Sequence, residues 1–322
     1  MRIVKYYQTN LALGSDVGLT LVSSKSTKDI DEIFAGLWHY IYTFERSFSR
    51  FIPKSELSLF NRTAGTQTKI TTEFRDLLMA AKSMSEATTG IYNPFILPAL
   101  QQAGYKRSAV PGYESDAFDD YSRRRVGSIY ELQIGQDWAK IPSDTALDLG
   151  GCGKGYLADK LGVILKNNGI SSYRLSLGGD ILTSGTDEVG QRWLIGIQDA
   201  RRLDREVEQT IECPIKPFGI ATSGTFGRKG YVAGSDWHHI IDPTTLEPAV
   251  TDIKLATVCA NTALQADTLA SCAVVVGSKK ATDLIKPLGA RFMLLQGDDD
   301  GEAFQAQFGK FKIKQSTQRG LL

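Results

Sequence analysis

The segment Thr145-Ala-Leu-Asp-Leu-Gly-Gly-Cys-Gly-Lys154 decides the fold that we expect for this chain. Residues 145–149 are mostly apolar, as in a buried β-strand, and Gly150-Gly-Cys-Gly153 is typical of a tight turn. From Lys154 to Lys166 the apolar residues recur at helical spacing, and Asn167-Asn168-Gly169 is typical of a C-terminal helix cap. The segment therefore predicts a strand, a glycine turn and a helix in succession.

Two further helices are predicted upstream of this segment. Apolar residues at i+3 and i+4 spacing predict a helix that is capped by Thr27 and reaches Phe48. A second helix is expected to begin after Thr71 or Thr72 and to end before Gly90. Each helix presents one apolar stripe, so both are expected to pack on the core.

Short strands are predicted downstream. Residues 171–177 form the next predicted strand, which ends at a second glycine turn, Gly178-Gly179-Asp180. Between residues 145 and 275, hairpin signals are about as frequent as crossover helices. We therefore expect an α+β fold with mixed or antiparallel sheets.

Residues 105–142 are expected to form a surface excursion. Their first half is polar and shows no regular spacing of apolar residues, and their second half predicts short strands.

Composition excludes several classes of protein. The 322 residues include 37 Lys and Arg against 36 Asp and Glu, a net charge of +1, so a basic nucleic-acid binder is not expected. Apolar stretches such as residues 269–276 are too short to cross a bilayer, so membrane insertion is not expected. The N-terminus lacks the apolar core of a signal peptide, so we expect a cytoplasmic protein. Buried free thiols are favoured over disulfides or a zinc site for the scattered cysteines Cys152, Cys213, Cys259 and Cys272.

The first glycine turn could bind a phosphate group. Gly150, Gly151 and Gly153 allow backbone amides to approach a bulky anion, the following helix directs its N-terminus at the same place, and Lys154 adds a full positive charge. The spacing matches neither a Walker loop nor a Rossmann fingerprint, and a purely structural turn explains the glycines equally well. Further loops with glycines and hydroxyls, at residues 178–180 and 221–225, favour a diphosphate ligand.

Two other segments could carry chemistry. Asp267 and Ser271 are four residues apart, so on a helix they share one face, and with a backbone carbonyl they would form an oxygen site of the kind that Mg²⁺ prefers. The alternative is that Asp267 caps the N-terminus of a helix.

In His238-His239-Ile-Ile-Asp242-Pro243 an imidazole near the surface could act as a general base, although paired histidines are also common as structural residues.

Several of these segments, in this order and spacing, resemble the ApbE family of FAD:protein FMN transferases. The resemblance rests on Asp148-Leu-Gly-Gly-Cys-Gly-Lys-Gly-Tyr156, Ser176-Leu-Gly-Gly-Asp180, Trp193-Leu-Ile-Gly-Ile197, Ala221-Thr-Ser-Gly224, His239-Ile-Ile-Asp-Pro243 and Ala266-Asp-Thr-Leu-Ala-Ser271. Upstream it extends to Ser49-Arg-Phe51, Ser55-Glu-Leu-Ser58, Asn61 and Gly90-Ile-Tyr-Asn-Pro94. The similarity runs from about residue 10 to about residue 300.

The resemblance implies one ApbE-like domain over residues 1–322, a compact unit of two interleaved subdomains with the ligand cleft between them. It implies Mg²⁺-dependent transfer of FMN from FAD onto a Ser or Thr hydroxyl of an acceptor flavoprotein, with release of AMP. By similarity, His239 activates the acceptor hydroxyl, and Gly151, Asp267 and Ser271 bind the metal. The positions that match flavin-binding motifs are Tyr92, Asn93, Asp148, Lys154, Gly178, Gly179, Thr222, Ser223 and Ile241.

Two alternatives to the transferase remain open from the sequence. One is a hydrolase that splits FAD into FMN and AMP with water in place of the alcohol. The other is a non-catalytic flavin-binding protein, although the presence of Asp267, Ser271 and His239 together argues against it. Cys152 and Asn93 depart from the family pattern, which more commonly has Gly-Ile-Ala-Lys at the turn and Asp at the position of Asn93.

Overall fold

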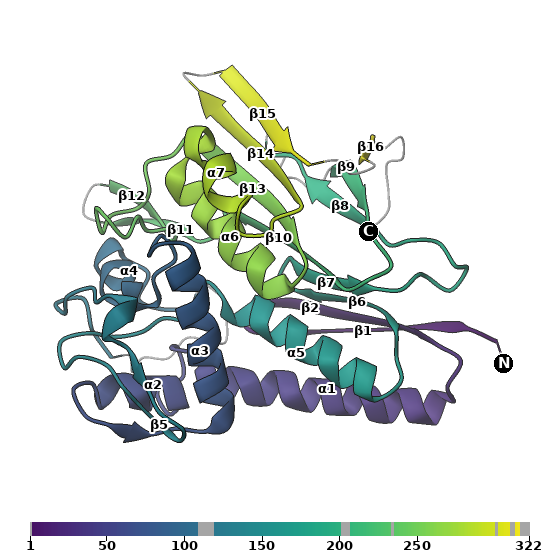
Figure 1. Ribbon diagram of the computed structural model, residues 1–322, viewed down its shortest axis with the longest axis horizontal. Coiled ribbons are helices and arrows are strands. Elements are labelled where there is room, and N and C mark those ends of the chain that lie inside the picture. The colour runs from purple at the N-terminus through teal and green to yellow at the C-terminus, as the bar shows by residue number, and fades with distance from the viewer. Residues whose placement is uncertain are drawn as a thin grey trace.

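An eight-stranded antiparallel sheet forms the centre of the computed structural model (Figure 1). The structure describes residues 2–108, 119–200, 207–232, 235–299, 302–309 and 313–315. The sheet order is β1 (Val4–Ala12), β2 (Ser15–Ser23), β6 (Ser172–Leu177), β7 (Asp180–Ser184), β10 (Phe218–Gly224), β13 (Ile253–Ala260), β14 (Phe292–Asp299) and β15 (Glu302–Phe308). Each neighbouring pair is antiparallel, so the predicted α+β fold is confirmed, in its antiparallel form.

The two faces of this sheet bury different partners. Along β14, Met293 and Leu295 belong to the larger core, whereas Phe292 and Leu294 belong to the smaller one, as the alternation of a strand requires. The larger core lies under the helices α1 (Thr27–Phe48), α5 (Gly153–Asn167) and α6 (Ala263–Val276). The smaller core lies under a three-stranded sheet of β8 (Leu194–Gln198), β9 (Val207–Glu212) and β16 (Ile313–Gln315).

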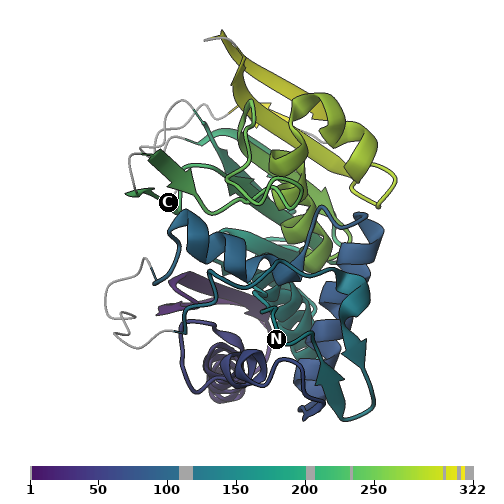
Figure 2. The ribbon, with the colours of Figure 1, turned by 90° about the vertical axis from the view of Figure 1, so that its left-hand side faces the viewer.

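A group of helices and short strands lies beside these layers (Figure 1 and Figure 2). Its helices are α2 (Glu56–Arg62), α3 (Thr72–Ala87), η1 (Pro94–Ile96), α4 (Leu97–Ala103) and η2 (Ile129–Glu131), and its strands are β3 (Thr68–Lys69), β5 (Trp138–Lys140) and β4 (Gln133–Ile134). The remaining elements are helix α7 (Ser278–Ile285) and the hairpin of β11 (Lys229–Val232) and β12 (Ser235–His238). The hairpin forms its own two-stranded sheet, separate from the main one.

Helix ends follow the capping chemistry of the sequence. Thr71 caps α3 by accepting a hydrogen bond from the Phe74 amide at 3.2 Å, and Asn168 with Gly169 (φ 72°) ends α5, both as predicted. The predicted cap of α1 was wrong by one residue. Ser26, not Thr27, is the N-cap, because its hydroxyl accepts from the Asp29 amide at 3.2 Å.

The strand predicted at residues 145–149 is absent from the structure. The buried side chain of Asn61 takes the place of a neighbouring strand: its amide donates to the Leu147 carbonyl at 2.9 Å and accepts from the Leu147 amide at 2.8 Å. The Asp148 amide donates to the Pro94 carbonyl. The backbone polar groups are therefore satisfied without a ladder, which periodicity could not reveal.

The predicted surface excursion is less peripheral than expected. Residues 109–118 lie outside the described part of the chain. Beyond them, Tyr121, Ile129 and Leu132 are buried, as are Ala139 and Ile141.

The prediction for the cysteines is confirmed, because all four are free and buried. Within the described residues, no helix combines the length and the apolar character needed to span a membrane.

Candidate active site

Helices α5 and α6 cap each other. Asp267 of α6 accepts a hydrogen bond from the Gly155 amide in the first turn of α5 at 3.1 Å. In return, Asp159 of α5 accepts from the Ala263 and Leu264 amides, at 2.9 and 3.0 Å, in the first turn of α6. A Cβ at Gly155 would lie 2.5 Å from the Ala263 carbonyl oxygen, so only glycine permits this contact. The α5 and α6 N-termini are thereby held in one fixed arrangement.

This arrangement corrects the capping interpretation of Asp267. Its own helix begins four residues earlier, where Thr262 is the N-cap. Asp267 does accept a hydrogen bond from a helix N-terminus, but that N-terminus belongs to α5, so the sequence of α6 alone could not show it.

The predicted metal-binding residues offer an all-oxygen donor set. Asp267 is only 5% exposed, and its pKa is raised to about 7 by burial and, next, by the charge of Asp180. Ser271 lies on the same helix, and its hydroxyl is 2.8 Å from the Ser223 hydroxyl of β10. The Gly151 carbonyl accepts no hydrogen bond from the described residues. A buried carboxylate that lacks a full set of partners, with neutral oxygens nearby, fits a hard cation such as Mg²⁺.

No group of three or more His, Cys, Asp and Glu side chains suited to a metal occurs among the residues that the structure describes. The proposed set contains a single carboxylate, so this finding neither adds to it nor removes it. Any ion at this place would rely on ligand and water oxygens for the rest of its coordination.

Lys154 is paired within the protein. Its ammonium group donates to Asp180, which is 3% exposed and follows the Gly178-Gly179 turn. Burial acts most strongly and would lower the pKa of Lys154, but the charges of Asp180 and Asp267 and the hydrogen bond to Asp180 together outweigh it, so the pKa is raised. Gly178 and Gly179 have φ values of 66° and 96°, a region that favours glycine, so this turn brings Asp180 to Lys154 at little strain.

Asp148 is also occupied by protein partners. One carboxylate oxygen accepts from the Gly150 amide at 2.8 Å, and the other lies 2.7 Å from the Arg50 guanidinium. Arg50 in turn donates to the Tyr105 carbonyl at 2.9 Å and lies over the rings of Phe51 and Tyr105, at 4.1 and 4.6 Å from their centroids. Asp148 therefore connects the first glycine turn to the segment that follows α4.

His239 is held by a neighbouring backbone carbonyl. Its amide donates to the Arg228 carbonyl at 3.0 Å, and its Nδ1 lies 3.3 Å from the same oxygen. An acceptor at this position favours the tautomer with the proton on Nδ1, which leaves Nε2 free to accept a proton. Burial, followed by the charge of Arg228, lowers the pKa of His239 to about 3, so the ring is neutral near pH 7.

His238 differs from its neighbour. Its Nε2 lies 3.2 Å from the Ala249 carbonyl, and burial lowers its pKa as well. This contact joins the end of β12 to the loop after the Asp-Pro turn, which is a structural role.

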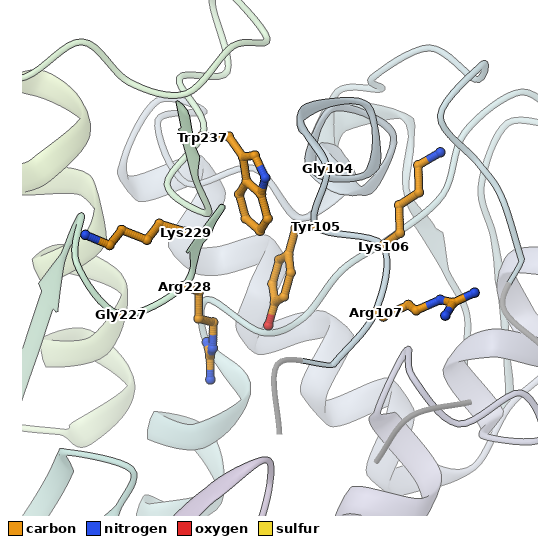
Figure 3. Close-up of a pocket in the computed structure, with 8 residues that line it drawn as sticks. All are labelled: Gly104, Tyr105, Lys106, Arg107, Gly227, Arg228, Lys229 and Trp237. Carbon is orange, nitrogen blue, oxygen red and sulfur yellow. The ribbon is translucent and has the colours of Figure 1, made fainter. Parts of the chain in front are cut away.

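A cavity of about 410 Å³ lies between the end of α4 and the β11–β12 hairpin (Figure 3). Tyr105 and Trp237 stack in its wall, with ring centroids 5.8 Å apart, and the Tyr105 ring meets His239 edge-on at 6.4 Å. The lining residues are Gly104, Tyr105, Lys106, Arg107, Gly227, Arg228, Lys229 and Trp237. Four of these carry positive charge and none is acidic, so the cavity suits an anion that also carries an aromatic ring.

The remaining predicted flavin-binding residues mostly have structural contacts. Asn93 caps η1 through the Phe95 amide and donates to the Gly127 carbonyl, both at 3.0 Å. The Thr222 hydroxyl bonds to that of Thr257 at 2.8 Å, and Ile241 is buried against Ala99 and Leu100. Tyr92 is buried with its ring beneath Gly151, where an added Cβ would lie 3.2 Å from it. As flavin contacts, these residues stay predictions.

The structure adds residues that the sequence did not single out. Arg50, Tyr105, Arg228 and Trp237 lie around His239 and Asp148, yet they come from three separate segments, since only Arg228 and Trp237 share the β11–β12 hairpin region. Arg50 had a signal, since it lies within the Ser49-Arg-Phe51 motif. For the other three, neither periodicity nor a motif indicated a place near the site.

Comparisons with known proteins now bear on this geometry. The model of the ApbE family matches residues 13–294. A relative from Klebsiella pneumoniae, named FAD:protein FMN transferase, is 28% identical over 281 residues, which cover 84% of this chain and 79% of the relative. A relative of the same name from Treponema pallidum is 26% identical over 308 residues, which cover 88% and 82% of the two chains.

Solved structures agree on the fold. The flavin transferase ApbE from Vibrio cholerae superposes with a TM-score of 0.78 at 22% identity, covering 95% of this chain and 97% of the other. The ApbE protein from Thermotoga maritima superposes with a TM-score of 0.79 at 23% identity, covering 98% and 97%. With a family match over most of its length, this chain belongs to the ApbE family.

Proposed function

We propose that this protein transfers FMN from FAD onto a Ser or Thr hydroxyl of an acceptor flavoprotein and releases AMP. The observation that carries the proposal is the neutral imidazole of His239, whose Nδ1 faces a carbonyl and which adjoins a cavity with positive and aromatic walls. The curated relatives named FAD:protein FMN transferase support the same activity.

Asp267, Ser271 and the Gly151 carbonyl would hold Mg²⁺ in this proposal. The ion, when bound, neutralises charge on the diphosphate of FAD. The reciprocal capping of α5 and α6 keeps Asp267 and the turn at Gly151 close together, because Asp267 accepts directly from Gly155. The protein thereby holds its oxygen donors in place before the substrate arrives.

His239 would act as the general base. Its Nε2 takes the proton of the acceptor hydroxyl as that oxygen forms a bond to the phosphorus of the FMN half. The bond from this phosphorus to the bridging oxygen breaks, and AMP leaves with the electron pair. Because its pKa is low, His239 is already in the unprotonated form that this step needs.

The same residues would allow water to replace the acceptor, which gives FMN and AMP. One experiment separates the two reactions. Purified protein is incubated with FAD and MgCl₂, with and without a Thr-containing acceptor domain, and intact mass and AMP are measured. We expect a mass gain equal to FMN on the acceptor, with AMP release that depends on the acceptor. Acceptor-independent AMP release would indicate the hydrolase, and absence of AMP in both arms would indicate a binding protein.

A further inference from the structure

Within the described part of the chain, the side chain of Arg228 has no hydrogen-bond or ion-pair partner, although it lies at the edge of the candidate site. Arg228 immediately precedes β11 and is half-buried. The neighbouring basic groups differ, since Lys154 is paired with Asp180 and Arg50 with Asp148. A partly buried guanidinium without an anion is unusual, because its desolvation is not compensated.

The side chain of Arg228 is directed differently from the other basic residues of the cavity. Figure 3 shows Arg228 and Tyr105 extending side by side in the same direction, whereas Lys229 extends to one side and Lys106 and Arg107 to the other. The backbone of Arg228 is fixed at the same time, because its carbonyl accepts from the His239 amide. The guanidinium is therefore attached next to the proposed base.

Its charge reaches both sides of the site. Arg228 lowers the pKa of His239, and it also acts to lower those of Asp267 and Lys154, which lie on the α5–α6 side. In the proposed function the reacting phosphate must lie within reach of His239, and Arg228 is joined to His239 through its own backbone carbonyl.

We propose that Arg228 is a catalytic residue that binds the phosphate of the FMN half of FAD and stabilises the negative charge on it during transfer. This inference rests on the proposed function. The planar guanidinium can donate two hydrogen bonds to two phosphate oxygens at once. While the acceptor oxygen bonds to phosphorus and the bond to the AMP phosphate breaks, those two oxygens keep their charge and the guanidinium stays bound to them.

The test compares FAD with riboflavin, a flavin that has no phosphate. Binding to wild type, Arg228→Ala, Arg228→Lys and Lys229→Ala is measured by flavin fluorescence, and single-turnover FMN transfer is measured at saturating FAD. We expect Arg228→Ala to weaken FAD binding at least tenfold, to leave riboflavin binding within about twofold, and to slow transfer by about 10²-fold or more. Arg228→Lys should lie between, and Lys229→Ala should change each quantity much less.

Three results would overturn the proposal. Equal weakening of FAD binding and riboflavin binding would show that Arg228 only shapes the cavity wall. Equal effects of Arg228→Ala and Lys229→Ala would show that the phosphate responds to the overall positive charge of the cavity and not to Arg228 in particular. A loss confined to the KM for the acceptor would mean that Arg228 binds an acceptor carboxylate instead. Lys216→Ala, on an exposed loop outside the cavity, controls for the change of charge, and melting temperatures control for folding.

Failure of the proposed function gives a different pattern. If wild type neither releases AMP nor modifies an acceptor, the transferase is wrong, while the preference for FAD over riboflavin still reports whether Arg228 contacts a phosphate.

Discussion

The two sides of the candidate site are built in opposite ways. On the α5–α6 side the charged groups have protein partners: Asp159 and Asp267 accept from helix N-termini, and Lys154 is paired with Asp180. On the other side, His239 and Arg228 belong to or adjoin a two-stranded hairpin that lies outside the main sheet, and Arg228 has no side-chain partner among the described residues. Each of these charged groups on the α5–α6 side has at least one protein partner, whereas the hairpin side leaves the charge of Arg228 to be compensated.

This difference follows from the physics of burial. Carboxylates within a helix pair must be hydrogen-bonded, or the cost of their desolvation would oppose folding. The hairpin side is stabilised by the stacking of Tyr105 on Trp237, which leaves polar groups available to a substrate. The α5–α6 pair thus holds its side chains rigidly in place, and the hairpin side supplies the charge that is available to a substrate. Substitutions on the two sides should accordingly affect different quantities.

The largest effect is expected from Asp267→Asn. An amide removes the one carboxylate charge of the proposed metal site, and the Asn oxygen can still accept from the Gly155 amide. We expect turnover to fall by about 10⁴-fold with a nearly unchanged melting temperature. The measurement is initial rate against Mg²⁺ concentration, with Ser271→Ala as a milder variant. A wild-type rate with wild-type Mg²⁺ dependence would remove the metal from this site.

His239→Ala tests the hairpin side. It should slow transfer by roughly 10²- to 10⁴-fold while FAD binding stays nearly intact, because a general base acts in the transition state. His238→Ala is the matched control, since that ring bonds only to the Ala249 carbonyl among the described residues. Equally mild effects of the two substitutions would show that the base has been assigned to the wrong residue.

Loss of the cap on α6 should affect stability more than chemistry. Asp159→Ala leaves the Ala263 and Leu264 amides without their acceptor, and we expect a loss of about 2 kcal/mol in the free energy of unfolding. Asp144→Ala is the comparison, because it removes an exposed carboxylate paired with Arg125 and should cost less than about 1 kcal/mol. Urea unfolding measures both. Similar losses would mean that the reciprocal caps add no more than a surface ion pair.

The low pKa of His239 predicts a pH-dependent stability. The folded state holds this ring neutral down to about pH 3, whereas in the unfolded chain it protonates near the ordinary histidine pKa of 6.5. Stability is therefore present above pH 6.5 and is lost as the pH falls toward 3. Relative to His239→Asn, wild type should lose about 2 kcal/mol between pH 7 and pH 5, measured by denaturant titration. Parallel curves for the two proteins would contradict a buried neutral ring.

Local patterns sufficed for much of the fold. Apolar spacing located α1, α3 and α5, and the glycine turns located the end of α5 and the β6–β7 hairpin, because caps and periodicity are properties of adjacent residues. The i, i+4 spacing of Asp267 and Ser271 likewise placed both on one helix, as observed. Ordered motifs then indicated the ApbE family, which the family comparison shows.

Other features depended on contacts between distant segments. The sequence by itself determined the helices, the turns and the family. It could not determine that Asn61 would replace a strand beside Leu147, a contact across 86 residues, or that Asp267 would cap α5 across 112 residues. The tertiary structure alone decided these contacts and the place of Arg228 beside His239 and Tyr105. The physical reason is that hydrogen-bond partners and burial of a side chain are set by whichever segment packs against it, and no local pattern encodes that partner.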